Sequence, residues 1–243
     1  MNKWLSGVMV GVGMWSAGMS VAQAGLTLDS TRLVLTQAKG ETQFRARNTS
    51  TDTNFLVQSR LSRTREGRES VGNFLVSPPL FRLEAGSTNA IRLRLLSPVG
   101  LPTDRESVFY LMTQGMPASP VPLRQSAAPA NGTGAGVTVG VGFSLKLFYR
   151  PTGLATPDEK VYQQATFTRV PGGVQLTNPT PYYFDLAGMA IDGKRVTFSA
   201  QSPALVPPKS QVVLATRSAL KKRVSWSVKD DFGGYKSFSA DIH

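Results

Sequence analysis

The chain has 243 residues, with 27 Lys and Arg against 15 Asp and Glu, no Cys, and a single His at its last position. Without Cys, and with His243 as its one His, the sequence cannot assemble a Ser/His/Asp triad, a Cys nucleophile or the usual zinc ligands. The neighbouring carboxylates Asp230 and Asp231 are candidates for proton transfer, but carboxylates in a turn are more often caps or salt-bridge partners. We therefore expect no enzyme, no metal site and no cofactor.

A net charge of +12 is also found in proteins that bind nucleic acid. Here, however, the basic residues are spread along strand-like segments, and the longest basic run is KKR at 221–223. This distribution favours a solvated positive surface, and we expect no nucleic-acid partner.

Residues 1–24 have the features of a secretory signal peptide. A basic residue near the start precedes an apolar stretch at 5–19, and the small residues Ala22 and Ala24 flank a Gln. A membrane anchor is the competing interpretation, but Ser and Gly interrupt the stretch, and no later apolar run is long enough to span a bilayer. We expect cleavage after Ala24, export, and a protein that is not embedded in a membrane.

Short segments of alternating apolar and polar residues follow along the rest of the chain, separated by Pro, Gly, Asn and Asp. This period of two is typical of β-strands with one buried face, and no segment sustains a helical period. Such strands, recurring about every 8 to 15 residues, predict an all-β protein built from immunoglobulin-like β-sandwiches. The segments are 26–35, 42–48, 54–63, 89–96, 107–112, 137–149, 174–178, 182–191, 195–200, 211–215 and 224–228.

Two stretches interrupt this pattern. Residues 115–136 are rich in Pro, Ala, Gly and Ser, and they predict a loop. Residues 150–160 contain two Pro on either side of a turn-forming segment, and they predict a domain boundary. We therefore expect two domains, residues 25–152 and residues 153–243.

The segment 137–149 has an unusual strand pattern. Every odd position from Val137 to Leu147 is apolar, whereas the positions between them carry almost no side chain until Lys146. From the pattern alone, such an apolar face most often belongs to the core of its own domain.

Six motifs in a fixed order make the chain resemble the periplasmic pilus chaperones of the chaperone/usher pathway, the PapD-like family. The resemblance implies two immunoglobulin-like domains in a boomerang arrangement. It also implies a periplasmic protein that binds pilus subunits and delivers them to an outer-membrane usher. The alternative is a secreted structural protein, such as an adhesin or a pilus component. The motifs are STRLVL (30–35), SPPLFRLEAGSTNAIRL (77–93), LPTDRESVFYL (101–111), LKLFYRP (145–151), NPTPYYFDLAG (178–188) and DDFGGY (230–235).

In this family the last strand of the N-terminal domain completes a subunit that lacks one strand of its own sandwich. The resemblance implies that Val137, Val139, Val141 and Phe143 form this donated row. Without a subunit, the row would face solvent or a second copy of the protein. The loop at 115–136 resembles that of the long-loop branch of the family, although the Cys pair of many long-loop members is missing.

Two basic residues carry over by motif. Arg32 and Lys146 correspond to the cleft pair that anchors the C-terminal carboxylate of the subunit through charge-assisted hydrogen bonds. Without the resemblance, each would be interpreted as an ordinary exposed base.

A further set of charged residues is implied to be structural. Glu106, Arg150 and Asp231 correspond to the family's junction residues, where an Arg between two carboxylates would hold the interdomain angle. Because Asp230 directly precedes Asp231, either of the two could be the second carboxylate.

Overall fold

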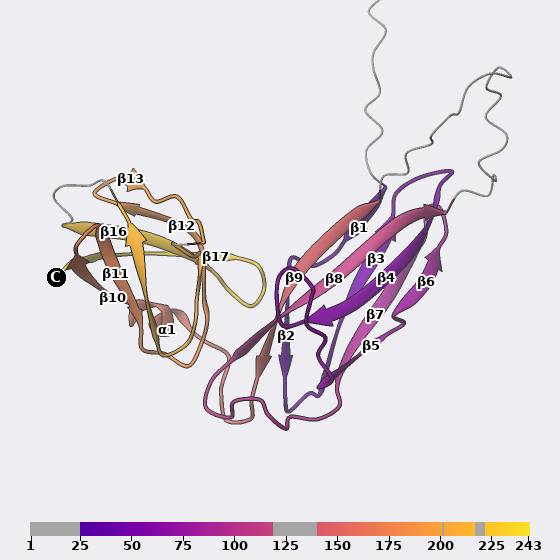
Figure 1. Ribbon diagram of the computed structural model, residues 1–243, viewed down its shortest axis with the longest axis horizontal. Helices are drawn as coiled ribbons and strands as arrows, with labels where there is room; N and C mark the ends of the chain where they lie inside the picture. Colours follow the sequence, from indigo (N-terminus) through magenta and orange to yellow (C-terminus); the bar gives the residue numbers. More distant parts are fainter. Residues whose placement is uncertain (1–24, 119–139, 201, 217–221) are drawn as a thin grey trace, which may run out of the picture.

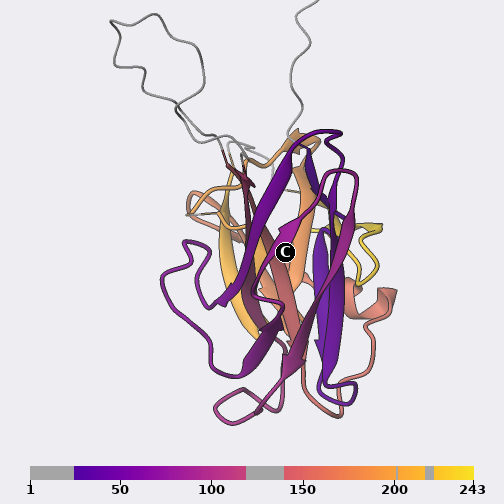
Figure 2. The ribbon, with the colours of Figure 1, turned by 90° about the vertical axis from the view of Figure 1, so that its right-hand side faces the viewer.

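The computed structural model describes residues 25–118, 140–200, 202–216 and 222–243. In this part of the chain, β-strands form two sandwiches, and one short helix, α1 (Glu159–Gln163), lies between them in sequence. Figure 1 shows that the sandwiches meet at one end and diverge at the other, and Figure 2 views them one behind the other. The predicted all-β, two-domain fold in a boomerang arrangement is confirmed.

The first sandwich pairs a four-stranded sheet with a five-stranded sheet. The four-stranded sheet has the order β1 (Leu26–Leu28), β3 (Glu41–Asn48), β7 (Thr88–Leu95) and β5 (Phe74–Ser77). The five-stranded sheet has the order β2 (Arg32–Thr36), β9 (Val141–Arg150), β8 (Ser107–Ala118), β4 (Asn54–Ser62) and β6 (Leu80–Leu83).

The second sandwich follows α1. One sheet has the order β10 (Thr166–Val170), β11 (Gly173–Asn178) and β15 (Ser210–Ala215). The other has the order β13 (Lys194–Arg195), β12 (Phe184–Ile191), β16 (Arg223–Lys229) and β17 (Tyr235–Asp241), and β14 (Leu205–Val206) also pairs with β12.

Each sandwich has its own hydrophobic core. The buried residues of the first core lie between Leu26 and Tyr149 in the sequence, and those of the second core lie between Tyr162 and Ile242. The alternation in β7 shows how the sequence builds them, because Ile91 and Leu93 are fully buried while the arginines between and after them are exposed. Burial of apolar surface therefore stabilises both domains in a chain that has no Cys.

The N-terminal segment of the first sandwich changes sheets. Strand β1 pairs with β3, and after three residues β2 pairs in parallel with β9 in the opposite sheet. Strand β2 covers residues 146–150 of β9, whereas β8 lies along the other side of β9 over nearly its whole length. Within the described residues, no strand pairs with 141–145 on the β2 side. The first half of β9 is therefore an open sheet edge.

Two predictions about local structure are wrong in part. The loop expected at 115–136 begins later, because β8 extends to Ala118 and pairs with β4 up to that residue. The strand expected at 195–200 is reduced to the end of β13, since residues 196–200 form no strand. Within the described ranges, no helix has the length and apolar character needed to cross a membrane.

Candidate functional site

The two faces of β9 serve different domains. On one face, Leu145, Leu147 and Tyr149 are buried in the first hydrophobic core. On the other face, Lys146 and Arg150 form ion pairs with residues of the second domain. The alternation of a single strand thus places a core face and a junction face back to back.

The open half of β9 carries the described part of the predicted donor row. Val141 is half-buried at the start of the strand, and Phe143 packs against the first core of its own domain. For Phe143, the free protein thus has the arrangement expected of an ordinary core residue. Val137 and Val139 lie outside the described residues.

Arg32 and Lys146 are direct neighbours in the parallel ladder between β2 and β9. Both side chains therefore leave the sheet on the same face, toward the second domain. Neither is the ordinary exposed base that the sequence would indicate without the family resemblance, because Arg32 is 9% exposed and the Lys146 side chain is 20% exposed. They are covered by the domain junction.

The guanidinium of Arg32 is held on two sides. Its Nη1 donates a hydrogen bond of 2.7 Å to the backbone carbonyl of Lys229 on β16, and its Cζ lies 4.2 Å from the centre of the Phe148 ring. Its Nε–H is buried and has no hydrogen-bond partner in the described structure. A buried donor without an acceptor is unfavourable, so this group can take an additional acceptor.

Lys146 has a partner in the second domain. Its Nζ lies 2.5 Å from Asp185 Oδ1, and the Asp185 side chain is 5% exposed on β12. Next to this pair, the rings of Phe148 and Tyr183 pack edge to face with centres 5.7 Å apart. The sequence motifs include Asp185 but indicate no role for it, although its charge is out of place in the run of apolar residues that forms β12.

Arg150 lies at the centre of a buried network. Its Nη2 and Nε donate to Glu106 Oε1 at 2.7 and 3.0 Å, and its Nη1 donates to Asp231 Oδ2 at 2.8 Å. Glu106 Oε2 accepts a hydrogen bond from the backbone N–H of Tyr183 at 2.9 Å. Asp230 instead accepts hydrogen bonds within its own turn, from the N–H groups of residues 232 and 234. The carboxylate that meets Arg150 is therefore that of Asp231.

Burial and ion pairing shift the pKa values in this network. Burial raises the pKa of Glu106 above its ordinary value, although the positive charge of Arg150 opposes this shift. Burial alone would lower the pKa of Arg150, but the hydrogen bond to Asp231 and the charges of both carboxylates raise it overall. Arg150 is therefore a permanent cation at the junction.

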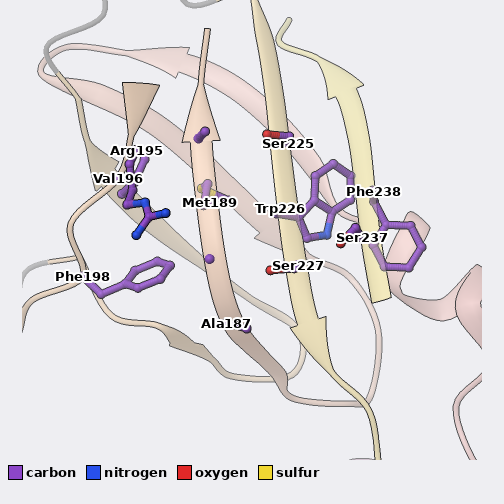
Figure 3. A pocket seen from close by; sticks show the side chains of 12 residues that line it. Ala187, Met189, Arg195, Val196, Phe198, Ser225, Trp226, Ser227, Ser237 and Phe238 are labelled. Atoms are coloured by element: carbon purple, nitrogen blue, oxygen red, sulfur yellow. The ribbon is translucent and has the colours of Figure 1, made fainter. Parts of the chain in front are cut away.

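A separate hollow of about 530 Å³ lies in the second domain, on the sheet formed by β12, β16 and β17. Figure 3 shows Ser225 and Ser227 on β16, with Phe198 on the far side of β12. Its lining includes Ala187 and Gly188 of the 178–188 motif, but none of the residues for which the sequence predicts a role. The charged residues with a predicted role gather at the domain junction instead.

Comparisons with known proteins agree with this arrangement. Residues 25–155 match the pili and flagellar-assembly chaperone PapD N-terminal domain, and residues 160–240 match the pili assembly chaperone PapD C-terminal domain. The fimbrial chaperone YcbF of Escherichia coli K12 is 34% identical over 218 residues, which cover 87% of this chain and 86% of YcbF.

Two solved structures have the same fold. The E. coli chaperone DraB matches with a TM-score of 0.75 and 26% identity, over 90% of this chain and 96% of DraB. A chain of the Salmonella enterica complex between the SafA pilin and the SafB chaperone matches with a TM-score of 0.74 and 27% identity, over 89% and 95% of the two chains. Since both family domains match in order and cover most of the sequence, the protein belongs to the PapD family of pili assembly chaperones.

Proposed function

We propose that this protein is a periplasmic chaperone that binds pilus subunits by adding a strand to them and then delivers them to an outer-membrane usher. Membership of the chaperone family supports this function, as does the fold that the protein shares with one chain of the structure of the SafA pilin in complex with the SafB chaperone. The alternative, a secreted adhesin or pilus component, is not favoured, because both domains match assembly chaperones.

The open edge of β9 is the surface to which a subunit would add. Backbone N–H and C=O groups along 141–145 have no strand beside them on the β2 side, within the described residues. A subunit that lacks one strand has the complementary defect, and pairing the two edges satisfies both. Val141, with Val139 and Val137 before it in sequence, would fill the subunit's apolar groove. Phe143 would stay in the chaperone's own core.

The position of β2 defines how such a strand would lie. Strand β2 occupies the same side of β9, starts at Arg32 and runs parallel to β9. A subunit strand along 141–145 that also runs parallel to β9 would end where β2 begins. Its C-terminal carboxylate would then meet the guanidinium of Arg32 and the ammonium of Lys146.

The unpaired Nε–H of Arg32 is the observation that carries this proposal. The donor is buried beside Lys146 at the end of the open edge, and a carboxylate would satisfy it with a charge-assisted hydrogen bond. Holding the end of the subunit strand at this point would also set its register against β9.

Co-purification with a subunit encoded beside this gene tests the proposal. We expect Arg32→Lys, which keeps the charge but loses the planar fork, and Lys146→Gln to recover little or no complex from periplasm. Lys209→Gln is the matched control, because Lys209 also forms an ion pair across the junction, with Asp104, but its side chain is 43% exposed. Normal recovery of complex with both site variants, in proteins that melt like the wild type, would refute the anchor.

The periplasmic location has a separate test. If residues 1–24 are a signal peptide, the protein purified from the periplasmic fraction begins at Gly25. An intact N-terminus at Met1 in the purified protein would contradict export.

A further inference from the structure

The ammonium group proposed to hold the subunit is already paired in the free protein. Lys146 Nζ contacts the carboxylate of Asp185 at 2.5 Å, and the pair joins β9 of the first domain to β12 of the second. A carboxylate in this position is chemically similar to the C-terminal carboxylate that a subunit strand would bring.

The charges at the junction are balanced before any subunit arrives. Arg32, Lys146 and Arg150 supply three positive charges close to one another, and Glu106, Asp185 and Asp231 supply three negative charges. Because Glu106 and Asp231 both bond Arg150, Asp185 is the carboxylate next to the anchor pair. A subunit carboxylate that binds here would add a surplus negative charge beside Asp185.

We propose that Asp185 sets the affinity of the subunit anchor by competing with the subunit's C-terminal carboxylate for Lys146. In the free protein the Asp185 carboxylate pairs with the partly buried ammonium group of Lys146. When a subunit strand binds, the two carboxylates share one ammonium and repel each other, so the grip is weaker than Arg32 and Lys146 alone would give. A weaker grip favours release, which a chaperone that passes on its subunits requires. This inference rests on the anchor role proposed for Arg32 and Lys146.

The substitution Asp185→Asn separates charge from shape. Asn keeps an Oδ1 that can accept the hydrogen bond from Lys146, but it removes the negative charge. Asp104→Asn is the matched control, because Asp104 also pairs with a lysine across the junction, at 2.6 Å to Lys209 Nζ, while its side chain is half exposed. Both variants change the net charge of the protein equally.

The probe is the alternating hexapeptide N-acetyl-Thr-Val-Thr-Val-Thr-Tyr, made with a free C-terminal carboxylate and as its C-terminal amide. Titration of each form into the full mature chain, followed by NMR, gives the two dissociation constants. We expect Asp185→Asn to bind the free acid about tenfold more tightly than the wild type, the scale of removing a nearby like charge at a partly buried site. We expect unchanged binding of the amide. Asp104→Asn should match the wild type with both forms.

A double variant tests whether Asp185 acts through the lysine. In a Lys146→Met background, Asp185→Asn should favour the free acid less than it does with Lys146 present, because the ammonium for which the carboxylates compete is gone and only their mutual repulsion remains. If the wild type prefers the free acid but Asp185→Asn binds it equally or less tightly, the competition is refuted and the anchor stands. If the wild type binds acid and amide equally, the anchor fails and the inference about Asp185 fails with it.

Discussion

Arg150 Nη1 lies 2.8 Å from Asp231 Oδ2, and this contact joins the last strand of the first domain to the turn between β16 and β17 in the second. The same guanidinium bonds Glu106, whose other oxygen accepts from the backbone of Tyr183. One fully buried cation thus fixes three segments of chain. Because Lys146 lies on the same face of β9 and Arg32 lies beside it on β2, the network also determines what faces these two residues.

Replacing Arg150 with Met should strongly destabilise the protein. The side chain is 2% exposed, and its loss leaves the buried carboxylate of Glu106 without a counter-charge. Breaking a buried ion pair in this way lowers the free energy of unfolding by about 3 to 5 kcal/mol. Chemical denaturation of the purified variant and the wild type measures the difference.

Arg105→Met provides the comparison for that experiment. Arg105 pairs with its neighbour Asp104, and both side chains are about half exposed. Exposed pairs of this kind contribute little to stability, so this variant should unfold close to the wild type. Equal destabilisation of the two variants would show that Arg150 does not hold the junction.

The raised pKa of Glu106 predicts a specific pH dependence. The folded protein holds the proton of the Glu106 carboxyl group more tightly than the unfolded chain does. The contribution of Glu106 to the free energy of unfolding is therefore fully present below pH 4.5, which is the ordinary pKa of this group. It is lost as the pH rises through the raised pKa of the folded state. The difference in unfolding free energy between the wild type and Glu106→Gln should therefore fall as the pH increases above 4.5. A difference that rises with pH would show that Arg150 outweighs burial.

Sequence patterns predict the strands well but not what covers the junction. The alternation in β7 and β9 identifies the faces that enter the first core, because burial follows the two-residue period. The same alternation predicts that Lys146 is an exposed base, because the residues around it in sequence do not show that a second domain lies over it. The partner Asp185 is 39 residues away in sequence, and its position depends on how the two sandwiches pack. Contacts between domains are set by tertiary packing, which a pattern within one strand does not contain.

Gly115 on β8 should not tolerate a side chain. A Cβ at this position would lie 2.3 Å from Leu26 Cδ2, and Leu26 is buried in the first core. Gly115→Ala should therefore force the Leu26 side chain to move within the first core. We expect it to lower the free energy of unfolding by about 1 kcal/mol, the low end of the cost of overpacking, because the contact is with the end of a side chain. Thermal and chemical unfolding measure the effect.

Gly142→Ala is the control for Gly115→Ala. Gly142 lies on the adjacent strand β9, and a Cβ there would meet nothing within 4 Å. We expect this variant to unfold like the wild type or slightly above it, because Ala has less conformational freedom than Gly in the unfolded chain. If Gly115→Ala were equally harmless, Leu26 would have to move freely, contrary to its burial.

Val141 and Ser144 distinguish donation of β9 from a role in the protein's own core. Val141 is half-buried at the start of the open edge, whereas Ser144 is exposed on the opposite face of the same strand. Val141→Glu should place a charge in the apolar groove of a bound subunit and weaken the complex by about 3 kcal/mol or more. Ser144→Gln should leave the complex intact, because its side chain points away from that groove and brings no second carboxylate to the face that carries Lys146. In the free protein both variants should melt near the wild-type temperature, since neither side chain belongs to the buried core.

Thermal unfolding of each free variant, paired with co-purification of the subunit, separates the alternatives. If Val141→Glu instead unfolds the free protein, the residue serves its own domain, and the donated row would have to end before it.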